Sequence, residues 1–163
     1  MIGLALGFIV LVVILYELAK RHERLYWAAR AGREWEVRLL LAVGAGHSVY
    51  KDAAGDRAIH AASYRGHVTV LKLLLKAGAD KNKIGCLHQT PLLWASSTGK
   101  TDVVRALLDA GADKSVKNNR GKTALDLARE HTEKPLSGKK YAAMLALLEE
   151  ESEHDAWAPQ SVD

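Results

Sequence analysis

The sequence predicts an all-α fold, a solenoid of about four stacked helix-turn-helix repeats with projecting loops, preceded by a transmembrane helix. Two observations lead to this prediction. A pattern of apolar residues and glycines recurs at a fixed period through most of the chain, which is typical of stacked repeats. The first nineteen residues are almost entirely apolar, which is typical of a segment that lies in a bilayer.

The period is visible when three segments of the chain are compared directly. Residues 57–62 align with residues 90–95, and these align in turn with residues 123–128 at the same spacing. The later segments Ala77–Asp80 and Ala110–Asp113 follow in step, both reading Ala-Gly-Ala-Asp. A less regular first copy begins near residue 25, slightly out of step with the others. The chain is therefore expected to contain four repeats, of which the first is the most degenerate.

Each repeat has the pattern of two short amphipathic helices joined by a glycine turn. A second glycine, after the Leu-rich helix, can take the left-handed conformation that ends a helix. The turn glycines are Gly32, Gly66 and Gly99, and the helix-ending ones are Gly44, Gly78 and Gly111. Thr90 and Thr123 are expected to cap the next helix, with Pro91 at its first position. Because one helix pair cannot bury its apolar face alone, the pairs must stack.

These repeats resemble those of the ankyrin-repeat family. The resemblance covers about residues 24–151 and rests on Thr90-Pro91-Leu92, on Gly66-His67 and on the two Gly-Ala-Asp endings. It implies an L-shaped stack of helix pairs with projecting hairpin loops, and protein binding as the usual activity. The resemblance also implies that His60 and His67, at motif positions, hydrogen-bond to backbone and to adjacent repeats.

Two departures from the family pattern carry predictions of their own. Arg57 stands where the family has threonine, so Asp56 is expected to cap that helix. His88 occupies the place that Gly55 and Gly121 occupy in their loops, so this loop is expected to be reshaped.

The predicted domains are an anchor over residues 1–20, an ankyrin-repeat domain over residues 21–151 and an acidic tail over residues 152–163. Within the domain the repeats are expected over about residues 24–56, 57–89, 90–122 and 123–151. Residues 1–148 hold all 23 Lys and Arg residues but only 13 of the 19 acidic ones, so the body is basic and its end acidic. This asymmetry favours an anionic partner or surface, although solvated charge explains it as well.

The anchor prediction depends on the run Ile2–Tyr16, whose only polar side-chain group is the Tyr16 hydroxyl. A helix over residues 1–19 would be about 28 Å long at ~1.5 Å per residue, close to the ~30 Å hydrocarbon core. A cleaved signal peptide, a buried soluble helix and a transit peptide are the alternatives. The run lacks the basic start of a signal peptide and the Arg and Ser content of a transit peptide. We therefore expect an uncleaved single-pass anchor.

The charges after the run predict its orientation. They are Lys20, Arg21, Arg24, Arg30 and Arg33. The positive-inside rule then places the N-terminus outside and the repeats on the cytoplasmic or matrix-like side, with the mitochondrial inner membrane one candidate. Gly3 and Gly7 form a G-x-x-x-G pair for helix packing, and Glu17 is either solvated or paired with a neighbouring subunit. Trp27 and Trp35 fit membrane contact and capping of the stack equally.

The predicted partner-binding surface combines loop tips with the inner helices of the stack. The loop-tip residues form one basic row: Lys51, Arg57, Lys81, Lys83, Lys114, Lys117, Arg120 and Lys122. The inner-helix residues are Ser63, Tyr64, Arg65, Ser96 and Ser97. Trp94 is interpreted as a packing residue of the same helices. Such a row suits an acidic protein surface or anionic lipid headgroups, and nucleic acid is disfavoured because no aromatic residues interleave in the row.

Few residues could carry chemistry. Cys86 and His88 lie in one loop, but a zinc site needs about four ligands, and nucleotide-binding and hydrolase motifs are absent from the sequence. We therefore expect neither an enzyme nor a metal or other cofactor. The leading hypothesis is an accessory or scaffold subunit of a larger membrane complex. The alternatives are a stand-alone membrane-tethered adaptor for acidic partners or anionic lipid, and a metal- or thiol-dependent enzyme centred on Cys86 and His88.

Overall fold

Within residues 20–46, 56–132 and 138–150, which the computed structural model describes, the chain forms helices and no strands. Residues 20–31 are helical and pair with α2 (Glu34–Ala42). The later pairs are α3 (Ala58–Arg65) with α4 (Val68–Lys76), α5 (Pro91–Ser97) with α6 (Thr101–Asp109), and α7 (Ala124–Thr132) with α8 (Gly138–Glu150). A single 3-10 turn, η1 (Cys86–His88), lies in the loop before α5. The described residues thus contain four helix pairs, which confirms the all-α repeat architecture.

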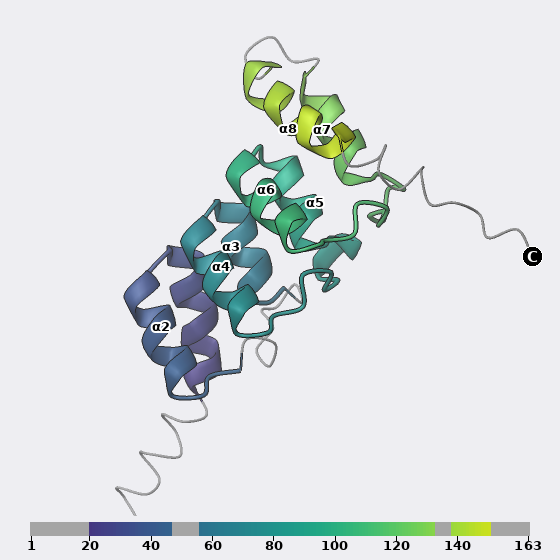
Figure 1. Cartoon of the computed structure of the whole chain (residues 1–163). Coiled ribbons are helices and arrows are strands. Elements are labelled where there is room, and N and C mark those ends of the chain that lie inside the picture. The colour runs from purple at the N-terminus through teal and green to yellow at the C-terminus, as the bar shows by residue number, and fades with distance from the viewer. Residues whose placement is uncertain (1–19, 47–55, 133–137, 151–163) are drawn as a thin grey trace, which may run out of the picture.

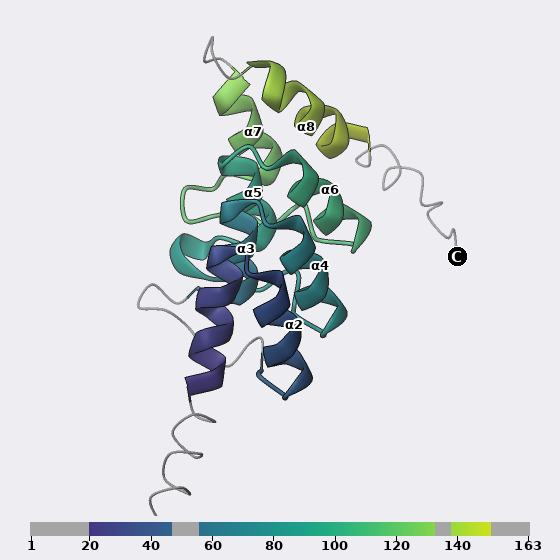
Figure 2. The same ribbon diagram turned by 90° about the vertical axis from the view of Figure 1, so that its left-hand side faces the viewer.

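The helix pairs stack into two columns, as Figures 1 and 2 show. The inner column holds residues 20–31, α3, α5 and α7, and the outer column holds α2, α4, α6 and α8. From α2 onward, a helix contacts its neighbour one repeat away in the same column, and the two helices of each of the last three pairs contact each other. Chain order therefore becomes spatial order along the stack, as expected of a solenoid.

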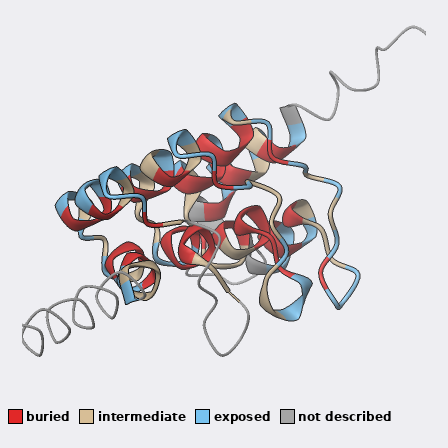
Figure 3. Cartoon of the chain, turned by 90° about the horizontal axis from the view of Figure 1, so that it is seen from below, coloured by how far each residue is buried: buried red, intermediate tan, exposed pale blue. Residues whose placement is uncertain are grey.

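The core lies between the two columns and runs through all four helix pairs, so that the buried faces of the two rows of helices point toward each other (Figure 3). Leu71 and Leu74 of α4 and Leu107 of α6 are completely buried there. Burying one such side chain stabilises the fold by about 1.5–3 kcal/mol. The apolar spacing in the sequence therefore decides which face of each helix turns inward.

The glycine turns have the backbone that the sequence predicts. Gly66, between α3 and α4, has φ +87°, and Gly78, after α4, also has φ +87°. A side chain at such a φ is strained, whereas glycine adopts it readily. The first of these glycines lets the chain reverse direction between α3 and α4, and the second ends α4.

The predicted threonine caps are confirmed. The Thr90 hydroxyl accepts a hydrogen bond from the backbone N–H of Leu93 at 3.3 Å, and Pro91 occupies the first helical position. Thr123 and Asp126 cap α7 reciprocally, since each side chain accepts a hydrogen bond from the other residue's backbone N–H. This is the arrangement of a capping box.

The predicted cap by Asp56 is wrong. Arg57 occupies the N-cap position of α3, and its backbone N–H donates to Nδ1 of His60 at 3.1 Å. The Asp56 carboxylate instead accepts a hydrogen bond from the backbone N–H of Cys86 at 2.9 Å, in the loop of the next repeat. Asp56 therefore ties two successive loops together.

The loop before α5 is reshaped, as predicted from His88. Leu87 and His88 have φ values of +54° and +58°, in the left-handed region, and Gly121 has φ +72° at the equivalent place one repeat later. A left-handed conformation costs a residue with a Cβ roughly 1–2 kcal/mol. The 3-10 turn η1 therefore contains local backbone strain that the loop around Gly121 avoids.

Among the described residues, no helix is both long enough and apolar enough to cross a bilayer. The predicted anchor, with Gly3, Gly7 and Glu17, lies outside the described residues. The same holds for Lys51 and for the acidic tail over residues 152–163.

Candidate protein-binding site

Two histidines hold the repeats in register around the site. His60 is only 1% exposed, and its Nε2 lies 2.7 Å from the carbonyl oxygen of Lys83 in the next loop. Since Nδ1 of the same ring accepts from Arg57, Nε2 must carry the proton and donate. Nε2 of His67 lies 3.2 Å from the carbonyl oxygen of Arg30 in the preceding repeat. The structural role that the family resemblance implied for both histidines is confirmed.

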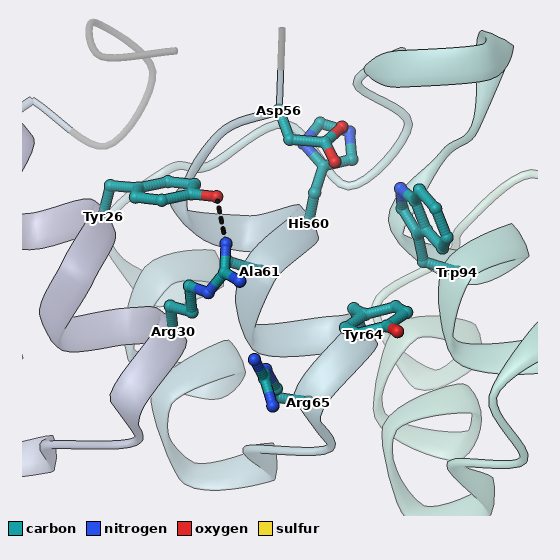
Figure 4. Close-up of a pocket in the computed structure, with 8 residues that line it drawn as sticks. All are labelled: Tyr26, Arg30, Asp56, His60, Ala61, Tyr64, Arg65 and Trp94. Carbon is teal, nitrogen blue, oxygen red and sulfur yellow. Dashed lines mark hydrogen bonds between the residues drawn. The ribbon is translucent and has the colours of Figure 1, made fainter. Parts of the chain in front are cut away.

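Aromatic and arginine side chains follow one another along the inner column, across the first three repeats. We call this set the aromatic–arginine strip; its members are Tyr26, Trp27, Arg30, Tyr64, Arg65 and Trp94. All but Trp27 are labelled in Figure 4, which shows them pointing into a shared space between the inner helices. The strip is built from residues 20–31, α3 and α5, so packed helices position each member.

The first part of the strip holds Arg30 between two rings. Its guanidinium carbon lies 5.5 Å from the centre of the Trp27 ring, a cation–π distance. One of its Nη atoms donates to the Tyr26 hydroxyl at 3.3 Å (Figure 4). Tyr26 and Trp27 meet edge to face at 5.2 Å. These contacts restrict the Arg30 side chain before any ligand arrives.

The second part of the strip joins α3 to α5. Tyr64 is 45% exposed and meets Trp94 edge to face, with ring centres 5.2 Å apart. The guanidinium carbon of Arg65 lies 5.9 Å from the centre of the Tyr64 ring. Tyr64 therefore contacts an aromatic ring on one side and a cation on the other.

The strip borders two adjoining hollows. The first, of about 230 Å³, is lined by five strip residues together with Asp56, His60 and Ala61. The second is lined by Trp27, Arg30, Ala31, Arg33, Arg65 and His67. Arg30 and Arg65 line both hollows. This concave surface suits an extended chain better than an enclosed small molecule.

The predicted inner-helix residues differ in exposure. Tyr64 and Arg65 are exposed and Ser97 is half-buried, so all three can contribute to a surface. The prediction that Ser63 and Ser96 belong to the binding surface is wrong, because both residues are 0% exposed. The Ser63 hydroxyl donates to the carbonyl oxygen of Ile59 one turn earlier. Complete burial removes both serines from any surface that a partner could meet.

The predicted basic row of loop tips is only partly available. Lys117 and Arg120 are exposed, whereas Arg57, Lys83 and Lys114 are half-buried. Lys81 is also half-buried, and its ammonium donates to the carbonyl oxygen of Ala110 in the next repeat. Lys122 forms an ion pair of 2.6 Å with Glu130. Several of these cations therefore support the stack instead of projecting from it.

One loop tip contains a carboxylate, that of Asp113, which is held by hydrogen bonds. Asp113 accepts hydrogen bonds from the hydroxyl and the backbone N–H of Ser115, and these bonds lower the pKa of its carboxyl group. The Asp113 backbone N–H donates in turn to the Asn82 side chain at 2.9 Å. Successive loops are thus joined to each other by side-chain hydrogen bonds.

Sequence reasoning missed Arg30 and Trp27 as site residues and interpreted Trp94 only as packing. A signal was present, because aligning the first copy with the second places Arg30 opposite Tyr64. The same alignment places Trp27 opposite Ala61, and Ala61 corresponds to Trp94 in the third copy. Aligning the repeats position by position would have shown that these side chains share one face.

Cys86 and His88 lie together in η1, Cys86 half-buried and His88 exposed. In the parts of the chain that the structure describes, no group of three or more His, Cys, Asp or Glu side chains is arranged to hold a metal ion.

Comparison with known proteins shows what this chain is similar to. The family model described as ankyrin repeats (3 copies) matches residues 10–85 and residues 81–156. A transient receptor potential cation channel subfamily A member 1 homolog of Caenorhabditis elegans is 40% identical over 73 residues, 45% of this chain and 5% of that protein. Protein phosphatase 1 regulatory subunit 12A of Rattus norvegicus is 36% identical over 107 residues, 61% of this chain and 10% of that protein.

A probable E3 ubiquitin-protein ligase, XBOS33, of Oryza sativa subsp. japonica is 38% identical over 78 residues, 47% of this chain and 15% of that protein. The chain therefore corresponds to only a small part of each of these relatives.

Proposed function

The chain belongs to the ankyrin-repeat family, and from that premise we propose that it is a membrane-anchored module that binds another protein through the aromatic–arginine strip. In this proposal the chain is an accessory or scaffold subunit of a larger membrane complex. The repeats lie on the cytoplasmic or matrix-like side, and the N-terminus lies on the other side.

The observation that carries the binding proposal is the strip itself. Tryptophan, tyrosine and arginine are the residues that most often dominate the energy of protein–protein contacts. Here they line one concave surface and are held in place by one another. One relative is by its name a regulatory subunit of a phosphatase, which is a precedent for such repeats acting within an assembly.

The anchor proposal stands on the sequence of residues 1–20. Its apolar run has about the length of a bilayer core and is followed at once by basic residues. Helical residues 20–31 follow this run directly and pack into the first repeat. A tether of this kind would hold the strip close to the membrane that contains the partner.

A photo-crosslinking amino acid at two positions tests the binding proposal in membranes that contain the full chain. Tyr64 lies on the strip, whereas Lys72 is exposed on α4 of the outer column and is the matched control. We expect a discrete crosslinked protein from position 64 and none from position 72. Equal crosslinking from both positions, or none from position 64, would contradict the proposal.

Two further measurements test the membrane and complex parts. After an alkaline carbonate wash the full chain should stay in the membrane pellet, because a spanning helix resists extraction; release into the supernatant contradicts the anchor. In native electrophoresis after mild detergent, the crosslinked species should migrate with a larger assembly. Migration as an isolated pair would favour the stand-alone adaptor.

A further inference from the structure

The aromatic–arginine strip contains two arginines without an ion-pair partner, and one buried N–H without a hydrogen-bond acceptor, among the described residues. Arg33, on the rim of the second hollow, is paired with Glu36 at 2.8 Å. Arg30 and Arg65 form no such pair: the ion pairs of the described residues involve Arg33, Arg38, Lys122 and Arg129 instead. Two arginines that line both hollows therefore have no carboxylate partner among the described residues.

A third donor lies in the same place. Nε1 of Trp94 is buried and has no hydrogen-bond partner among the described residues, although Trp94 lines the first hollow. Leaving a buried N–H without an acceptor costs about 1–3 kcal/mol. An acceptor oxygen from a bound ligand would relieve that cost once the side chains that cover Nε1 move aside.

We propose, building on the protein-binding function above, that the strip recognises an extended acidic segment of the partner. A glutamate or aspartate carboxylate lies between Arg30 and Arg65, and a backbone carbonyl oxygen of the segment accepts from Nε1 of Trp94. The planar guanidinium forks match a carboxylate and form charge-assisted hydrogen bonds to it. The exposed ring of Tyr64 packs against the apolar part of the segment.

The strip also determines the orientation of that segment. Asp56 lines the first hollow (Figure 4) and accepts from the backbone of Cys86. Arg30 and Arg65 border the second hollow as well. A ligand carboxylate is attracted toward the two arginines, whereas the Asp56 carboxylate offers it no hydrogen-bond donor. The acidic residue therefore lies toward the first repeat, and a neutral part of the segment lies toward Asp56.

Single-stranded nucleic acid is the other ligand class that aromatic and arginine residues can bind. Stacked bases would have to compete with Arg30, which lies over the Trp27 ring, and with Arg65, which lies over the Tyr64 ring. The Asp56 carboxylate also opposes a continuous phosphate backbone. An acidic peptide is therefore the better match.

The test uses the full chain in detergent micelles and two fluorescein-labelled decapeptides. One contains three glutamates separated by leucine and serine, and in the other the glutamates are glutamines. Fluorescence anisotropy should show at least tenfold tighter binding of the glutamate peptide, weakened by added salt. Equal affinities for the two peptides, including no binding by either, would overturn the proposal.

Two double variants locate the binding. Arg30→Gln with Arg65→Gln should weaken the glutamate peptide at least tenfold, whereas Lys72→Gln with Lys76→Gln, the same loss of charge on the exposed side of α4, should change it less than twofold. Circular dichroism melting establishes that both variants fold. Similar losses in both variants, or a labelled oligothymidylate that binds more tightly than the glutamate peptide, would also overturn the proposal.

These outcomes are separate from those of the protein-binding function. If position 64 crosslinks a partner in membranes while the two peptides bind alike, only recognition of an acidic segment fails. If position 64 crosslinks nothing, the binding function itself fails, whatever the peptides do.

Discussion

The first and third repeats follow the same plan but bury their outer helices differently. In the third repeat, α6 lies between α4 and α8, and Val103, Val104, Leu107 and Leu108 are all buried. In the first repeat, α2 contacts α4 and leaves Trp35 67% and Leu39 55% exposed. An apolar residue on a repeat helix is therefore buried only when a neighbour covers that side.

The largest expected difference comes from truncating one leucine on each of the two helices. Leu107→Ala should lower the free energy of unfolding by about 3 kcal/mol, because it empties a completely buried site. Leu39→Ala should lower it by less than about 0.5 kcal/mol, since that side chain is mostly exposed. Urea unfolding of the full chain, followed by circular dichroism, measures both; equal losses would show that α2 is covered in solution.

A smaller effect is expected from the loops on either side of the third repeat. His88→Gly should raise the free energy of unfolding by about 1 kcal/mol, because glycine accepts the left-handed φ of +58° without strain. Gly121→Ala is the matched change in the following loop, where φ is +72° and an added Cβ meets no atom within 4 Å. It should destabilise by about 1 kcal/mol through backbone strain alone, and a destabilising His88→Gly would contradict this account.

The smallest effect concerns the two threonine caps, since only Thr123 has a carboxylate partner. Backbone and side-chain hydrogen bonds from Thr123 lower the pKa of Asp126 below its ordinary value of 3.8. A lowered carboxyl pKa stabilises the fold above the unfolded value, and this stabilisation is lost as the pH falls through the folded pKa. Asp126→Asn should therefore reduce the loss of stability between pH 5 and about pH 3, measured by urea unfolding; an unchanged loss would exclude the cap as its source.

Much of the fold could be predicted because its signals are local. Thr90 with Pro91 predicts a helix start from adjacent residues, and Gly66 predicts a turn from the conformation that glycine alone adopts easily. His88 at a glycine position predicted the reshaped loop for the same reason. The repeat period then predicted the stacking, since equivalent apolar faces can be buried only against one another.

The candidate site was predicted less completely because its properties depend on neighbouring repeats. Tyr64 and Arg65 were assigned to the surface correctly, but Ser63 lies next to them and is buried. Lys81 was expected to project, yet its ammonium donates to Ala110, 29 residues later. A contact between two residues so far apart along the chain leaves no recognisable pattern in a single sequence.

The amino-acid sequence alone was enough to predict the family, the positions of the turns and caps, and which face of each interior helix is apolar, because these follow from side-chain chemistry within one repeat. Only the tertiary structure shows which polar groups already have a hydrogen-bond or ion-pair partner. Lys81 donates to the carbonyl oxygen of Ala110 and Asp56 accepts from the backbone of Cys86, each in the next repeat, whereas Trp94 Nε1 finds no acceptor among the described residues. Satisfaction of a charge or a donor depends on atoms from adjacent repeats, and the distances to those atoms are set only when the helices stack.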